Sequence, residues 1–269
     1  MLFRSFLKKK GKMRNLTAYI IFIHLIFNVS CQQYYVPKGR SLHTATLIGT
    51  KIYFLGGSFN KGNYITTTQS LNDFFYLDIS KPFDKTKEAL PFVDLSEKAL
   101  EIPPHLGAST FVIGESKDTI FLYGGNVEDL DKNIFSLMYS FNTTQSLNWK
   151  PVIVSQGLVP PRKQLTGSVI DENGKIHIFA GGILGNEFPK YYFSNGMDVF
   201  DTNNQIWTNI TNIQIGLNGR DGHTATFLPD TGEIIYIGGF SGDSLIDITN
   251  VCNTYVTFFI TGRSQTVSI

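Results

Sequence analysis

The chain has 269 residues, enough for one or two domains at about 150 residues per domain, and it can bury a core without disulfides or metals. Charged residues make up 17% of it, against roughly 25% in an average soluble protein, and aromatic residues reach 13%. This composition excludes a disordered chain. Together with 25 glycines, it favours short strands joined by tight turns.

The first 31 residues differ in charge from the rest of the chain. They hold six basic residues and no acidic one, so residues 32–269 carry a net charge of −5. An apolar stretch, Ala18–Phe27, follows the basic start. This order predicts a secretory signal peptide at residues 1–31, cleaved near Cys31–Gln32, with Met13 as an alternative initiator. The competing hypothesis is an uncleaved membrane tether, for which the stretch is short, since a span needs about 20 residues.

The predicted signal implies a secreted or cell-surface protein. Beyond the predicted signal, the sequons at Asn142 and Asn209 then become candidate N-glycosylation sites. Cleavage would leave Cys252 as a single cysteine, whereas retention of Cys31 permits one disulfide bond.

Four short apolar runs each end in a glycine pair, at spacings of 68, 57 and 57 residues. One such run is a weak signal, but four at near-regular spacing indicate a repeat architecture. The structural repeat glycines are Gly56, Gly57, Gly124, Gly125, Gly181, Gly182, Gly238 and Gly239.

The flanks of the glycine pairs repeat as well. Gly39–Leu47 and Gly219–Phe227 share an Arg followed by His-Thr-Ala-Thr; Pro161–Val169 keeps the Arg, and Pro103–Phe111 lacks it. Turn signals such as Asn173-Gly174 join these segments to the apolar runs and predict hairpins.

Further strands are predicted after the first three glycine pairs, at Phe74–Ile79, Ile134–Tyr139 and Met197–Asp201. Each unit is therefore predicted to be a four-stranded antiparallel sheet. The units span approximately residues 36–95, 100–155, 158–212 and 216–269, the last of them degraded.

The strand before each glycine pair is apolar throughout instead of alternating, which indicates burial on both faces. Sheets packed radially, as the blades of a β-propeller, bury both faces of their inner strands. The glycines would end such a strand where the backbone packs closely or takes a positive φ.

These residues resemble kelch-repeat proteins, whose superfamily includes galactose oxidase-like domains. The shared pattern is an apolar run, Gly-Gly, and an aromatic residue seven positions before a Trp. Phe200 and Trp207 keep that spacing, Trp149 closes the second unit, and Phe92 is a candidate substitute in the first.

The resemblance implies an all-β, kelch-type β-propeller of about four blades over residues 32–269. Four blades are fewer than such propellers usually have, so we expect an incomplete, open ring. A compact four-bladed ring is the alternative.

Few residues suggest chemistry. His43 and His223 occupy equivalent repeat positions, and we interpret them as structural strand residues far from each other. His105 is expected in a loop and His177 in a core strand. Because no two histidines stand at ligand spacing and no Cys–His cluster exists, we expect no metal and no cofactor.

The distribution of charged residues argues against two classes of ligand, calcium and nucleic acid. The acidic segment Glu128–Asp131 lacks the glycine and later glutamate of a calcium loop, so we interpret it as a solvated loop. The net charge of −5 on residues 32–269 argues against nucleic acid as a partner.

The main functional hypothesis is a non-enzymatic interaction module that binds protein or glycan through blade loops. The alternatives are a galactose oxidase-like copper enzyme or another carbohydrate-active enzyme, and a truncated propeller fragment without independent function. The candidate contact loops are Ser58–Leu71, Asn126–Asn133, Ile183–Asn195 and Phe240–Ser244.

Overall fold

The computed structural model of the protein divides the chain into two units, with the boundary between Val36 and Pro37. The predicted signal peptide, the Glu128–Asp131 segment and both cysteines lie outside the described residues. Within the described ranges, no helix is long and apolar enough to cross a membrane. The structure describes residues 35–60, 68–84, 90–114, 116–127, 136–145, 148–184, 191–210, 219–241 and 256–259.

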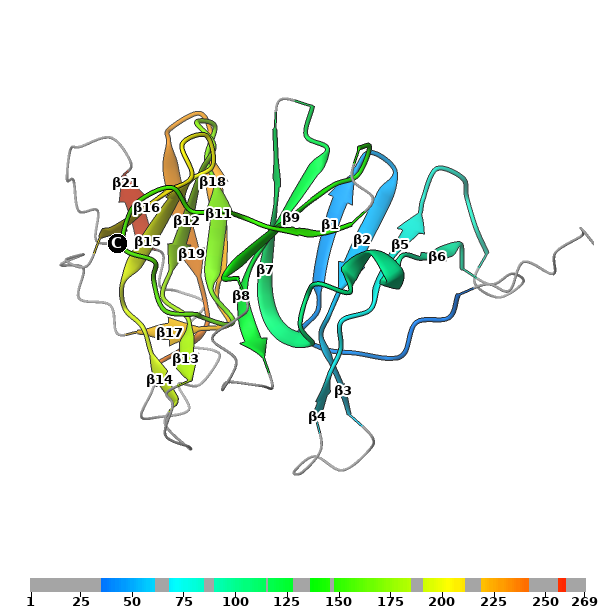
Figure 1. The fold of residues 1–269 in the computed structure, drawn as a ribbon. Helices are drawn as coiled ribbons and strands as arrows, with labels where there is room; N and C mark the ends of the chain where they lie inside the picture. Colours follow the sequence, from blue (N-terminus) through cyan, green and yellow to red (C-terminus); the bar gives the residue numbers. More distant parts are fainter. Residues whose placement is uncertain are drawn as a thin grey trace, which may run out of the picture. The chain divides into compact units, whose positions relative to one another are not determined.

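Four antiparallel sheets, which we call blades 1 to 4, follow one another along the chain (Figure 1). Blade 1 contains β1 (Thr44–Ile48), β2 (Lys51–Leu55), β5 (Phe74–Asp78) and β6 (Phe92–Asp94). Blade 2 contains β7 (His105–Ile113), β8 (Thr119–Val127), β9 (Met138–Asn142) and β10 (Lys150–Pro151). Blade 3 contains β11 (Gly167–Ile170), β12 (Lys175–Phe179), β15 (Met197–Asp201) and β16 (Ile206–Ile210). Blade 4 contains β18 (Thr224–Leu228), β19 (Glu233–Ile237) and β21 (Val256–Phe259).

The prediction of an all-β, kelch-type propeller with about four blades is confirmed. In the fourth unit, which we predict to be degraded, three strands lie within the described residues. One strand differs from expectation. The third strand of blade 2 is predicted at Ile134–Tyr139, of which residues 134 and 135 lie outside the described residues, and β9 begins at Met138. Leu137 comes just before β9, and its carbonyl accepts a hydrogen bond from Gly124 N–H, as the Asp73 carbonyl does from Gly56 N–H just before β5.

Three two-stranded ribbons continue the chain beyond the glycine pairs. Figure 1 shows β3–β4 and β13–β14 extending past the ends of the blades. A short 3₁₀ helix, η1 (Ser96–Ala99), follows blade 1. The ribbons are β3 (Ser58–Asn60) with β4 (Thr68–Ser70), β13 (Gly182–Leu184) with β14 (Tyr191–Phe193), and β17 (Arg220–Asp221) with β20 (Phe240–Ser241).

The second strand of each blade presents alternate residues to two faces. The front face packs on the preceding blade and the back face on the following one, as the three core clusters show. The front-face residues of blades 1 to 4 are, in that order, Ile52 and Phe54, Ile120 and Leu122, Ile176 and Ile178, and Ile234 and Tyr236. The back-face residues of blades 1 to 4 are, in the same order, Tyr53 and Leu55, Phe121 and Tyr123, His177 and Phe179, and Ile235 and Ile237.

Aromatic side chains fill the spaces between blades, as predicted. Trp149 stacks on Phe141 and lies edge-on to Phe74 between blades 1 and 2. Trp207 contacts Phe200 and Tyr123 between blades 2 and 3.

Phe92 takes the corresponding position in blade 1. It pairs with Leu77 across β5–β6, just as Trp207 pairs with Phe200 across β15–β16. The first unit therefore keeps an aromatic residue where the third has Trp.

Candidate functional site

The glycine pairs mark one end of the blades, which we call the glycine end. At Gly56 and Gly124 the N–H donates within the blade, to the carbonyls of Asp73 and Leu137 at 3.2 and 3.0 Å. At Gly57 and Gly125 the N–H donates to the following blade, to His105 and Lys163. All four have φ between +65° and +98°, a backbone region that favours glycine.

In blade 3 the structural pair is Ala180-Gly181, one residue earlier than the Gly181-Gly182 pair in the sequence. Ala180 has φ +55° and donates within the blade to Gly196, and Gly181 donates to Arg220 of blade 4. Gly182 instead begins β13, where a Cβ would collide with the Tyr191 hydroxyl. Gly182 is therefore a close-approach glycine outside the repeat register.

A line of backbone hydrogen bonds joins the four blades where their first strands begin. Gly107 N–H donates to the Leu42 carbonyl, Leu165 N–H to Gly107, and Gly222 N–H to Leu165, each at 2.8 Å. All four residues have φ between +54° and +67°. Sequence reasoning missed this position, although the alternation of Leu and Gly in the aligned units was a signal for it.

These residues surround a cavity of about 270 Å³ to which all four blades contribute. Hydroxyl groups bridge neighbouring blades. In the cavity lining Ser109 Oγ lies 3.0 Å from Thr166 Oγ1, and elsewhere between blades 1 and 2 Thr46 Oγ1 donates to Thr110 Oγ1 at 2.7 Å. The lining consists of Leu42, His43, Gly107, Ala108, Ser109, Leu165, Thr166, Gly222 and His223.

His43 and His223 line this cavity together, which corrects the expectation that they lie far apart. The blades converge there, so equivalent repeat positions meet at one place. His223 Nε2 accepts a hydrogen bond from Gly167 N–H at 3.1 Å. Burial lowers the pKa of His223 to about 4, and Arg220 adds to the effect. Burial and Arg40 also lower the pKa of His43.

The other two histidines are buried. His105 is the first residue of β7 and not a loop residue as predicted, because its backbone pairs with Val127 and bridges Leu71. Burial lowers its pKa to about 4. His177 lies in a core strand as predicted, with Nε2 3.0 Å from Asp171 Oδ2.

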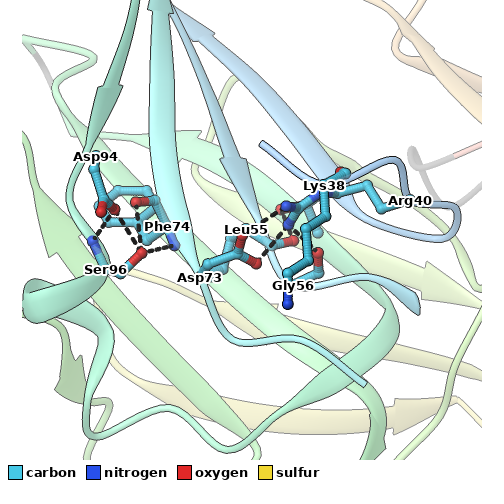
Figure 2. Close-up of polar contacts among 9 residues, drawn as sticks. Lys38, Arg40, Leu55, Gly56, Asp73, Phe74, Asp94 and Ser96 are labelled. Atoms are coloured by element: carbon cyan, nitrogen blue, oxygen red, sulfur yellow. Dashed lines mark hydrogen bonds and ion pairs between the residues drawn. The ribbon is translucent and has the colours of Figure 1, made fainter. Parts of the chain in front are cut away.

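Arg40 anchors the glycine end of blade 1. Its Nη1 donates to the Gly56 carbonyl at 3.1 Å, and its two terminal nitrogens bind both carboxylate oxygens of Asp73 at 2.5 and 2.6 Å (Figure 2). The guanidinium also lies over the Phe75 ring, 4.8 Å from its centre. Figure 2 also shows Ser96, whose backbone N–H and hydroxyl bind Asp94 at the start of η1.

Basic residues fix the glycine end of the other blades. Arg162 donates to the carbonyls of Gly124 and Ser136 at 2.9 and 2.8 Å, and Arg220 to Gly238 at 3.2 Å. Burial lowers the pKa of both guanidinium groups. In blade 3 Lys163 forms a buried ion pair of 2.6 Å with Asp198.

Four partly exposed apolar side chains belong to segments at the glycine end. Tyr191, Tyr192, Phe240 and Leu42 have between 38% and 47% of their surface exposed. The Tyr191 hydroxyl donates to Asp221, which neighbours Gly222 of the cavity lining. Burial and Asp221 raise the pKa of Tyr191.

The predicted contact loops are described in part: Ser58–Asn60, Thr68–Leu71 and Tyr191–Asn195 are described, whereas residues 128–133 and 242–244 are not. Asn142 is described, and its side-chain amide donates to Asp118 and Thr119 at 3.0 Å. Asn209 lies in β16. Among the described residues, no three His, Cys, Asp or Glu side chains form a group that could hold a metal.

Repeated four-stranded blades, paired glycines and inter-blade aromatics define a β-propeller built from sequence repeats. A family model, the KLHDC2/KLHL20/DRC7 Kelch-repeats domain, matches residues 42–260. The chain belongs to the kelch-repeat family. Kelch repeats mediate protein–protein interactions, and proteins with such domains are generally non-enzymatic.

The chain is 27% identical over 206 residues to Kelch domain-containing protein 3 of Rattus norvegicus and of Mus musculus. The alignment covers 76% of this chain and 49% of each relative, so the chain spans about half the length of the curated relatives it matches.

Proposed function

We propose that the chain is a non-enzymatic module, secreted or on the cell surface, that binds a protein partner at the glycine end of its blades. The observation that carries the proposal is the group of exposed side chains Tyr191, Tyr192, Phe240 and Leu42. Aromatic residues with one exposed face supply large contact areas at low entropic cost, and they are enriched where interfaces have most of their binding energy.

The backbone under these side chains is held in place. Gln164 and Gly182 exchange two hydrogen bonds of 2.9 Å, which ties β13 to the entry of blade 3. Tyr191 is fixed by its bond to Asp221, and Phe240 pairs with the same Asp221 across β17–β20. A surface that is ordered before binding loses less entropy when a partner arrives.

The proposed location rests on the basic and apolar order of residues 1–31. A glycan is the alternative partner, because aromatic faces also suit the apolar faces of sugars. The copper-enzyme alternative has no observation in its favour beyond the two histidines of the cavity. Metal analysis of the purified protein tests it.

The test is a chemical cross-linking capture of extracellular partners, with the wild type compared against a Tyr192→Ser, Phe240→Ser double variant. The matched control is Leu100→Ser, Leu158→Ser, which removes two side chains that are each 77% exposed. We expect the double variant to lose a protein that the control retains. Partners lost equally from both variants, or released by glycosidase treatment, would contradict the proposal.

A further inference from the structure

Positions that are buried in every internal blade interface are partly exposed at two places in the fold. At the back-face position before the glycine pair, Leu55, Tyr123 and Phe179 are at most 2% exposed, whereas Ile237 of blade 4 is 39% exposed. The register is the same in all four blades, because these residues pair with Thr44, Ser109, Gly167 and Thr224, respectively.

The front face of blade 1 shows the same difference. Ile120, Ile176 and Ile234 of blades 2 to 4 are at most 1% exposed, but the equivalent Ile52 is only half-buried. On the adjacent strand Leu47 pairs with Ile52 and is 57% exposed.

The composition of this front face is that of a blade interface. Phe54, Leu77 and Phe92 complete it, all of them partly buried and apolar. Among the described elements, β7 and η1 pack on blade 1, and the cluster they form includes its back-face residues Tyr53 and Leu55.

The back face of blade 4 is the surface that would complement the front face of blade 1 in such an interface. Beside Ile237 it presents Thr224, Thr226 and the partly buried Ile235. The equivalent residues of blade 1, Thr44 and Thr46, are buried against blade 2. The back face of blade 4 therefore combines threonine and aliphatic side chains, as does the back face of blade 1. In blade 1 that combination is buried in the interface with blade 2.

We propose that the front face of blade 1 binds the back face of blade 4 in a second copy of this chain. The three internal interfaces all place a front face on a back face, so this contact would continue a packing that the fold already uses. The faces that meet are different, which makes the contact heterologous: copies close into a ring or extend as an open chain.

The internal interfaces also specify hydrogen bonds for this contact. The second glycine of each pair donates to the next blade, as Gly57 does to His105 and Gly125 to Lys163. By the same register, Gly239 of one copy donates to the Arg40 carbonyl of the other. This inference is independent of the proposed partner binding at the glycine end.

The experiment is sedimentation velocity on the full chain from micromolar to hundreds of micromolar concentration. We compare the wild type with Leu47→Asp, Ile237→Asp and the control Leu158→Asp, whose side chain is also largely exposed. A carboxylate placed in a closely packed apolar contact is costly unless it is paired. The wild type and Leu158→Asp should associate as concentration rises, and the other two variants should remain monomeric with unchanged circular dichroism.

An equimolar mixture of Leu47→Asp and Ile237→Asp separates this contact from a symmetric one. The first variant keeps the back face of blade 4 and the second keeps the front face of blade 1, so the mixture should form a dimer that neither variant forms alone. A wild type that stays monomeric throughout overturns the proposal. An Ile237→Asp variant that associates like the wild type overturns it as well, because front faces would then pair with each other.

Discussion

Arg40 and Asp73 bind each other through two parallel hydrogen bonds, and the same guanidinium holds the Gly56 carbonyl. The Arg40 side chain is only 5% exposed. One residue from the flanking repeat thus fixes the first glycine of its own blade, and Arg220 does the same for Gly238. The repeated Arg is therefore a structural element of the glycine end.

Replacing Arg40 should destabilise the fold. Arg40→Ala leaves the Asp73 carboxylate and the Gly56 carbonyl without this donor, which we expect to lower the free energy of unfolding by about 2–3 kcal/mol. Arg40→Lys should lower the free energy of unfolding by less, because the lysine ammonium keeps the charge but cannot form two parallel hydrogen bonds as the planar guanidinium does. Urea denaturation measures both. Lys38→Ala, at an exposed position two residues earlier, is the control and should change stability by less than about 0.5 kcal/mol.

Reverse exchanges between Gly and Ala should differ in their effect on stability at two equivalent repeat positions, Gly124 and Ala180. A Cβ at Gly124 would collide with the Lys163 carbonyl, and φ there is +69°. Gly124→Ala should therefore destabilise by more than about 2 kcal/mol. Ala180→Gly, at φ +55°, should stay within about 1 kcal/mol of the wild type, because relief of the left-handed conformation offsets the lost methyl group. Thermal unfolding of both variants checks this, and equal losses would contradict the assigned register.

The sequence-level predictions succeed where the signal is local. An apolar run that ends in glycine is read within a few residues, so β2, β12 and β15 lie where they were expected. The aromatic residues between the blades are predictable for the same reason, since Trp207 follows Phe200 at a fixed spacing in one hairpin.

The features that the sequence did not predict depend on contacts between residues distant in sequence. Ala180 occupies a glycine position because only the bonds to Gly196 and the next blade define the register. The shared cavity of His43 and His223 requires four blades to converge, which no single unit encodes. The bond from Tyr191 to Asp221 joins two ribbons of different units and has no sequence pattern.

Acid should destabilise the fold through two buried histidines. His105 and His223 have pKa values lowered by burial to about 4, against about 6.5 in the unfolded chain. The unfolded state then binds more protons, so stability is full above pH 6.5 and falls as pH decreases toward 4. The loss should be on the order of 3 kcal/mol per histidine.

A double variant, His105→Asn with His223→Gln, isolates this effect. Asn can still donate to the Pro103 carbonyl as His105 Nδ1 does, and Gln can still accept from Gly167 N–H as His223 Nε2 does. Urea titrations at several pH values should show a flatter dependence for the variant. An unchanged slope would mean that these histidines are not the cause.

Trp207 should tolerate one aromatic replacement and no truncation. It is 3% exposed and contacts Phe200 and Tyr123 in the interface of blades 2 and 3. Trp207→Ala removes that packing and should cost about 3–5 kcal/mol. Trp207→Phe should cost about 1–2 kcal/mol, because blade 1 already uses Phe92 at the equivalent position.

The measurement is denaturant unfolding followed by fluorescence of Trp149, the other of the two tryptophans, which lies in a different interface. Because blades 2 and 3 share the interface that Trp207 fills, its truncation should lower the unfolding midpoint seen at Trp149 as well. An unchanged midpoint for Trp207→Ala would show that blades 1 and 2 unfold independently of blade 3, and that the inter-blade aromatics do not couple the sheets.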